Sequence, residues 1–244
     1  MSESAFPKLS RPPLREALVD LRLRDDLPVS FLAKLEAPRG FPVNKEMKQG
    51  QFQLKLEKDR PFEAEVVKEE VFGRRYEKED GSEVVQLRRN GLTHSILKNY
   101  TSGDVLMETA RNSWQHFLAV SGPVNVSRLA VRYINSIEVP LGADFDEYLT
   151  AGPRIPNPLP QILNGFLQRV VVPFADDGAN AIITQAMEGP TVGNIPVVLD
   201  IDVFCDCSLE GASAEIWSRL DKLRSIKNMV FFSSLSPKMI NSYI

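Results

Sequence analysis

The sequence predicts an α+β protein: a curved antiparallel sheet built from two strand–helix–strands–helix units, with the helices packed on one face. Several segments of strand length alternate apolar and polar residues, which is typical of half-buried strands. Tight-turn dipeptides separate neighbouring strands, and two longer segments repeat apolar residues at helical spacing. This order of elements occurs twice, which indicates two pseudo-repeats, residues 10–122 and 123–244, in a single domain of residues 1–244. An unduplicated α+β domain explains the order equally well.

In the first half, strands come first and a long helix follows. Ala17, Val19 and Leu21 share one face of a strand over residues 14–24, while charged residues share the other. The other elements are a short helix from Pro28 to before Pro38, a strand over residues 51–57, a three-stranded meander over residues 72–100 divided by Asp80-Gly81 and Asn90-Gly91, and a helix from the capping-box segment Thr101–Asp104 to Gly122.

The second half begins with another alternating strand, over residues 128–139, which stops at Pro140. A proline-rich connection follows it. Near the end, the apolar run Met229–Phe232 is predicted to belong to the core, with a partner surface as the alternative. The remaining elements are a short helix over residues 161–167, strands over 170–174, 181–187 and 197–207, a helix over 213–227, and a last short helix that begins at Ser236-Pro237.

Composition excludes several classes of protein. The 244 residues are 43% apolar and 25% charged, the proportions of a globular protein. The 29 basic and 32 acidic residues give a net charge of −3, so no overall cationic field attracts nucleic acid. No stretch reaches the roughly 18 apolar residues of a membrane span, and the N-terminal residues lack a signal-peptide pattern. The cysteines, Cys205 and Cys207, are too close for a disulfide framework, so we expect a cytoplasmic protein that avoids membranes and nucleic acid.

One strand face concentrates acidic residues. Asp200, Asp202 and Asp206 share a face of the last long strand, and three carboxylates could hold Mg²⁺ or Mn²⁺. The alternative is that they pair with arginines of a neighbouring strand, such as Arg128 and Arg132. We favour the ion pairs, because a metal-dependent hydrolase normally adds histidine or further carboxylates from other loops.

Other catalytic or cofactor arrangements find little support. A zinc site would need Cys205 and Cys207 together with His94 and His116, but each histidine fits better as a packed or surface residue. The nucleophile-elbow, dinucleotide-binding and Walker A patterns do not occur in the sequence. We therefore expect no cofactor and favour a protein without enzymatic activity.

Several short motifs together resemble a sporadically distributed family of prokaryotic proteins for which no activity is established. The tetrapeptide Arg132-Tyr-Ile-Asn135 is the most specific of them. The resemblance implies a mobile or defence-linked locus, such as a toxin–antitoxin or anti-phage system, and carries over no catalytic residue. The other matching pieces are Pro12-Pro-Leu-Arg-Glu-Ala17, Val84-Val-Gln-Leu-Arg88, Asn90-Gly91, Trp114, Pro140 and the run from Lys227 to Ser236.

Three hypotheses for function follow. The first is a non-enzymatic interaction module that presents its open sheet or terminal helix to a protein partner, such as a cognate toxin or effector. The alternative is a sensor that binds an anionic metabolite or nucleotide between the half-repeats, with Arg128, Arg132, Tyr133 and Asn135 as ligand-binding candidates. For Tyr133 and Asn135, a structural role in satisfying backbone groups is favoured. The third is a metal-dependent hydrolase on the acidic strand face.

Overall fold

The computed structural model describes residues 6–55 and 63–244. Within them, nine strands form one open sheet in the order β2-β3-β4-β5-β1-β6-β9-β8-β7, and every neighbouring pair is antiparallel. The strands are β1 (Leu14–Leu23), β2 (Val43–Lys55), β3 (Glu63–Glu77), β4 (Glu83–Arg88), β5 (Gly91–Ile96), β6 (Asn125–Pro140), β7 (Leu167–Phe174), β8 (Ala179–Met187) and β9 (Asn194–Glu210).

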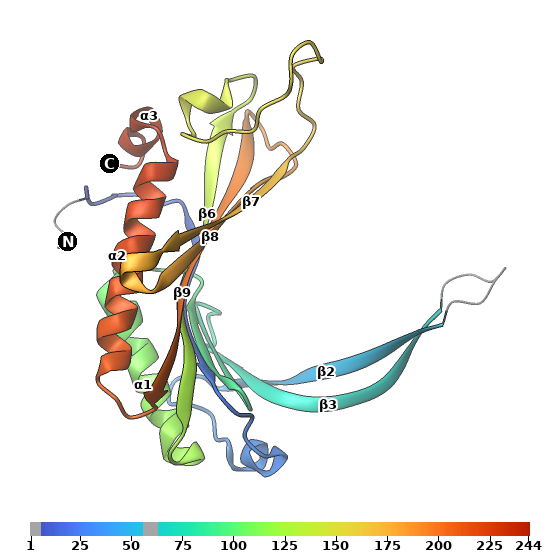
Figure 1. Cartoon of the computed structure of the whole chain (residues 1–244), viewed down its shortest axis with the longest axis vertical. Coiled ribbons are helices and arrows are strands. Elements are labelled where there is room, and N and C mark those ends of the chain that lie inside the picture. Colours follow the sequence, from blue (N-terminus) through green and yellow to red (C-terminus); the bar gives the residue numbers. More distant parts are fainter. Residues whose placement is uncertain (1–5, 56–62) are drawn as a thin grey trace.

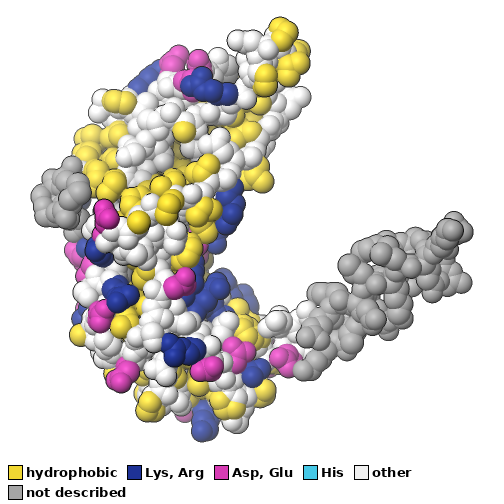
Figure 2. Space-filling view, in the orientation of Figure 1, with side chains coloured by type: hydrophobic (Ala, Val, Ile, Leu, Met, Phe, Trp, Pro, Cys, Tyr) yellow, Lys and Arg dark blue, Asp and Glu magenta, His cyan; other side chains and the backbone are white. Residues whose placement is uncertain are grey.

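Two long helices cover one face of the sheet. α1 (Gly103–Ser121) packs on β1 and β5, and α2 (Glu215–Ser234) packs on β6, β8 and β9 (Figure 1). The opposite face is hollowed (Figure 2), and β2 and β3 extend past the other strands of the sheet as a two-stranded arm. Among the described residues, no helix has the length and apolar character needed to cross a membrane. The short helices are η2 (Val29–Lys34), η3 (Phe145–Glu147), η4 (Ala175–Asp177) and α3 (Pro237–Asn241).

The core lies between the sheet and the two helices. Every second residue of β1 points into it, and Ala17, Val19 and Leu21 are fully buried. Trp114 of α1 is buried too, stacks on Phe117 with ring centroids 5.0 Å apart, and donates its indole N–H to a backbone carbonyl at 2.8 Å. The amphipathic pattern of each element therefore explains which face it buries.

The first strand of each half lies at the centre of the sheet. β1 and β6 are neighbours, and Val19 lies opposite Val131 in their register. The last strand before each long helix flanks the first strand of its half, so β5 lies beside β1 and β9 beside β6. The earlier strands of each half then run outward to the two edges, β2 and β7.

Most predicted elements are present. The strand over residues 14–24 is β1, the meander comprises the end of β3 with β4 and β5, and the helix after Thr101 is α1. Ser102 is its N-cap and accepts a hydrogen bond from the amide of Val105, while Gly122 ends it with a φ of 71°. The strand over residues 128–139 lies within β6, and Pro237 begins α3 as predicted.

Three predictions need correction. No helix forms over residues 161–167; the segment contains Gly165, a poor helix former, and Phe166 packs against the core while Ile162 is 77% exposed, so its apolar residues share no helical face. The strand predicted over residues 51–57 is the end of β2, which begins at Val43; residues 56 and 57 lie outside the described residues. The helix predicted to end at Lys227 continues to Ser234, because the apolar run that follows packs on the sheet as part of α2.

Candidate functional site

The centre of the open face holds an ionic network around Asp20 of β1. Asp20 is 7% exposed and accepts hydrogen bonds from Arg88 Nη2 at 2.7 Å and Thr93 Oγ1 at 2.6 Å. Arg22 Nε donates to it from 3.2 Å. Burial alone would raise the pKa of Asp20, but the Arg88 guanidinium and the Thr93 hydroxyl outweigh it and hold the pKa below its usual value. Asp20 is therefore a fixed anion beneath the hollow.

Arg128 of β6 links Asp20 to the acidic face of β9. Its Nη1 lies 3.6 Å from Asp20 Oδ2, and its Nη2 lies 3.2 Å from Asp202 Oδ2. The guanidinium also lies over the ring of Phe204, 4.4 Å from the ring centroid. Basic side chains gather in this part of the hollow (Figure 2). The charges of the open face are thus arranged as a network of alternating sign.

The three candidate metal-binding carboxylates share the open face of β9, but arginines engage two of them. Arg132 donates two parallel hydrogen bonds to Asp200, at 2.8 and 2.6 Å, while Arg128 engages Asp202. The predicted pairing with these two arginines is confirmed for Asp200 and Asp202. Asp206 lies further along the strand and is exposed. Across residues 6–55 and 63–244, no three His, Cys, Asp or Glu side chains gather in a way that could hold a metal ion.

The four candidate ligand-binding residues divide between the two faces of the sheet. Arg128 and Arg132 point toward the hollow, whereas Tyr133 and Asn135 point toward the helices, because neighbouring positions of β6 alternate. Asn135 is 3% exposed and donates to a backbone carbonyl of β9 at 3.1 Å, as the structural alternative predicts. The Tyr133 hydroxyl lies 3.4 Å from that of Tyr100.

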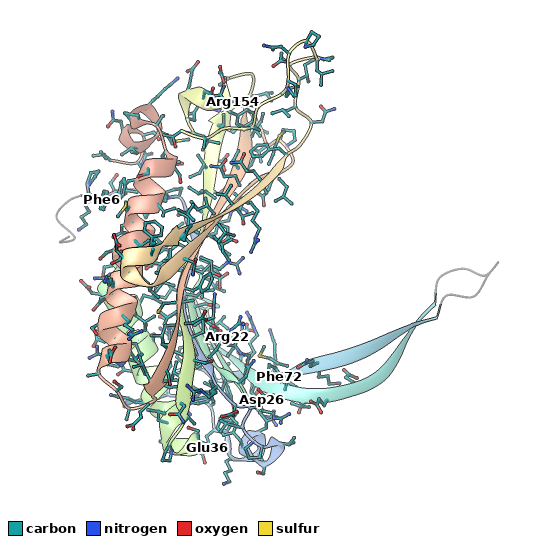
Figure 3. All side chains as sticks on the ribbon, viewed as in Figure 1. Phe6, Arg22, Asp26, Glu36, Phe72 and Arg154 are labelled. Atoms are coloured by element: carbon teal, nitrogen blue, oxygen red, sulfur yellow. The ribbon has the colours of Figure 1, made fainter. Side chains whose placement is uncertain are left out.

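A cavity of about 440 Å³ lies on the helix side, next to Tyr133 and Asn135. The segment before β1, the first turn of α1 and the C-terminal half of α2 form its other walls. Phe6 closes one side and stacks on Phe232 with ring centroids 4.8 Å apart. Figure 3 shows Phe6 beside α2, away from Arg22 on the open face. This cavity and the ionic network are therefore separate sites on opposite faces of the sheet.

The edge strand β7 exposes an unusual number of apolar side chains. Val170 is 42%, Val171 53% and Leu167 75% exposed, and β7 is the last strand in the sheet order, paired only with β8. Apolar side chains gather over this part of the molecule in Figure 2. Monomeric proteins usually blunt or cover such an edge, so this one is a candidate docking surface.

The structure also brings together a serine, a histidine and a glutamate. His94 Nδ1 lies 2.9 Å from Ser113 Oγ, and His94 Nε2 lies 3.3 Å from Glu83 Oε2. The close contact with His94 holds the pKa of Glu83 below its usual value, and Lys78 adds to the effect. Ser113 is only 5% exposed and lies in the middle of α1, where a substrate cannot reach it. The trio is an internal polar contact of the core rather than a catalytic triad.

Sequence reasoning missed both the cavity and the edge. The cavity combines segments more than 100 residues apart, and its one sequence signal is Lys227, which falls on the apolar stripe of α2 formed by Leu223 and Phe231. The edge could not be inferred because the order of strands in a sheet does not follow from their pattern. Comparison of the chain with protein-family models gave no match, and a search of curated proteins found no similar sequence.

Proposed function

We propose that the protein is a non-enzymatic interaction module that binds an extended segment of another protein along β7. The exposed valines of this edge strand are the observation that carries the proposal. An added strand gains backbone hydrogen bonds along the edge and apolar contacts on both faces, since Val170 and Val171 point to opposite sides. Pro173 lacks a backbone N–H, so pairing extends from Leu167 to Val172.

The chemistry of β7 specifies the partner segment. Within the described part of the chain, the exposed Arg169 forms no ion pair, and it shares its face of β7 with Leu167 and Val171. A complementary segment carries β-branched apolar residues and one acidic residue opposite Arg169. A cognate toxin or effector of a mobile or defence-linked locus is the class of partner we propose, in the reducing cytoplasm where Cys205 and Cys207 stay free thiols.

The absence of enzymatic activity is part of the same proposal. The buried Ser113–His94–Glu83 contact supports a non-enzymatic role, because the Ser113 hydroxyl is closed off from solvent. The alternative, an anionic-ligand sensor at Arg128 and Arg132, is less favoured, because a ligand there would compete with carboxylates already bound to both side chains.

We also propose that residues 10–122 and 123–244 are pseudo-repeats. The outward order of strands from β1 and from β6 supports this, as does the long helix that ends each set of strands. Among the described residues the first unit has five strands and the second four, so β7 corresponds to β3 in its distance from the centre, and β2 is an additional edge strand. β7 carries a short row of exposed valines, Val170, Val171 and Val172.

The test is co-purification with the products of the genes that neighbour its own. The full chain is expected to co-elute with one of them, and Val171→Glu is expected to weaken that binding at least about tenfold, because the new charge would be buried in the interface. Val29→Glu, a change at another exposed valine far from β7, serves as the matched control and should bind normally. Failure to co-elute with any neighbour overturns the proposal, as does equal binding by both variants. A dimer that Val171→Glu dissociates would assign the edge to a second copy instead.

A further inference from the structure

The cavity between α1, α2 and the segment before β1 has the make-up of a small-molecule site. Its volume of about 440 Å³ lies in the range of such pockets, and its walls are mostly apolar. A few polar groups converge on it, which is how pockets fix the orientation of a ligand. They include the side chains of Tyr100, Tyr133, Asn135 and Lys227, and Lys8, Asp104 and Asn228 also line the cavity.

Lys227 brings a positive charge into this cavity. The residue is only 8% exposed, and its Nζ lies 3.6 Å from the centroid of the Tyr133 ring. The same Nζ donates to Asn228 Oδ1 at 2.6 Å. These contacts hold the ammonium at the wall of the cavity, beside an aromatic face, where its field acts through a medium of low dielectric constant.

The first turn of α1 adds positive potential at the same wall. Ser102, Gly103 and Asp104 line the cavity, so the N-terminal end of a 19-residue helix points at it. Arg224 of α2 approaches this end closely: a Cβ on Gly103 would lie 2.7 Å from its guanidinium group. Arg224 Nη1 also lies 2.7 Å from Asp104 Oδ1. Two cationic residues of α2 thus flank the positive end of α1.

We propose that this cavity binds a small organic anion: a carboxylate or phosphate group attached to an apolar body. The anionic group lies beside the Lys227 ammonium and the backbone amides of the first turn of α1, where Arg224 pairs with Asp104, the acidic residue of that turn. The apolar body lies against the aromatic rings of Phe6, Phe231 and Tyr133. This site uses neither Arg128 nor Arg132. It is also independent of β7, so the proposal of an anion site and the proposal of partner binding at β7 fail or survive separately.

The probes are benzoate and phenyl phosphate, with inorganic phosphate and benzylamine as comparisons. Benzoate or phenyl phosphate is expected to bind with a dissociation constant of about 1 mM, as suits so small a ligand. At ten times that concentration it should raise the melting temperature by about 3 °C. The two probes distinguish a carboxylate from a phosphate ligand. Inorganic phosphate tests the need for the apolar body, and benzylamine tests the need for the negative charge.

Variants assign the binding to the cavity. Lys227→Met keeps the length of the side chain and removes the charge, and it should weaken binding at least about tenfold. Lys222→Met, on the same helix but exposed and paired with Asp177, is the matched control and should bind normally. Phe6 lies outside the sheet, so the Phe6→Ala variant should keep the fold. It should weaken binding because the ligand loses its contact with the ring, and it tests the site even if Lys227→Met fails to fold. Benzylamine or inorganic phosphate binding as well as the organic anions would overturn the proposal. So would the absence of binding, or unchanged binding in both cavity variants.

Discussion

Replacing Asp20 by Asn tests the ionic network of the open face. The substitution preserves shape but removes the charge. In the wild type, Asp20 Oδ1 accepts from Arg88 and Thr93, while Oδ2 faces Arg22 and Arg128. The amide oxygen of Asn can accept from Arg88 and Thr93 or from Arg22 and Arg128, but not from both sets of donors. Its NH₂ group, itself a donor, must then face the cationic groups of the other set.

The magnitude follows from burial. The side chains of Arg88 and Arg128 are 13% and 18% exposed, so each would keep a largely desolvated charge after Asp20 is neutralised. Breaking a buried pair costs about 3–5 kcal/mol, and the residual exposure lowers the figure. We expect Asp20→Asn to reduce the free energy of unfolding by about 2–4 kcal/mol at pH 7.

The pH dependence has a defined sign. The pKa of Asp20 is lower in the folded protein than in the unfolded chain, so its carboxylate stabilises the fold at pH values above about 4. That contribution is lost as the pH falls through the folded pKa, because the wild-type carboxyl group then becomes neutral as well. The difference between wild type and Asp20→Asn should therefore shrink in acid.

Urea unfolding at pH 7 and at lower pH measures both effects. The matched control is Asp206→Asn, an exposed carboxyl group on the same face of the sheet, which should change the free energy of unfolding by no more than about 0.5 kcal/mol. A cost below about 1 kcal/mol for Asp20→Asn at pH 7 would refute the reasoning. So would a difference from wild type that stays constant or grows as the pH falls.

Two further predictions concern the backbone and the thiols. Gly91 has a φ of 139°, and a Cβ there would lie 2.0 Å from the Leu21 carbonyl oxygen, so Gly91→Ala should cost more than about 2 kcal/mol in urea unfolding. Gly122→Ala, with open space around the new methyl group, should cost about 1 kcal/mol; equal costs would contradict the steric argument. Burial raises the pKa of Cys207 to about 11, so a thiol reagent at pH 8 should label it rapidly only after unfolding, and rapid labelling of the folded protein would be inconsistent with this.

The sequence predicted the elements of the fold better than their extent. Alternation identified β1 and β6, and Asp80-Gly81 with Asn90-Gly91 located the meander, because these signals are local. The predicted helix over residues 161–167 failed because Phe166 packs against the core while Ile162 stays exposed, so no shared apolar face stabilises a helix, which only the tertiary structure reveals. The order of strands likewise depends on long-range pairing, and no local pattern encodes it.

For the candidate sites, local patterns gave the direction of side chains but not their neighbours. The alternation of β6 explains why Arg132 and Tyr133 lie on opposite faces of the sheet, and the predicted pairing of Arg132 with the acidic face of the neighbouring strand is confirmed at Asp200. The cavity was missed because Tyr133 meets Lys227 only after α2 folds back onto β6. The exposed edge was missed because valines in a strand usually indicate burial, and β7 lies at the end of the sheet.

Hydrogen exchange of the purified complex tests the central claim most directly. An added strand would form backbone hydrogen bonds with the outer edge of β7, so amides between Leu167 and Val172 should exchange more slowly in the complex than in the free protein. The arm formed by β2 and β3 should be unaffected. Unchanged exchange in β7, with protection confined to the arm or to α2 and α3, would contradict the assignment of β7 as the binding edge.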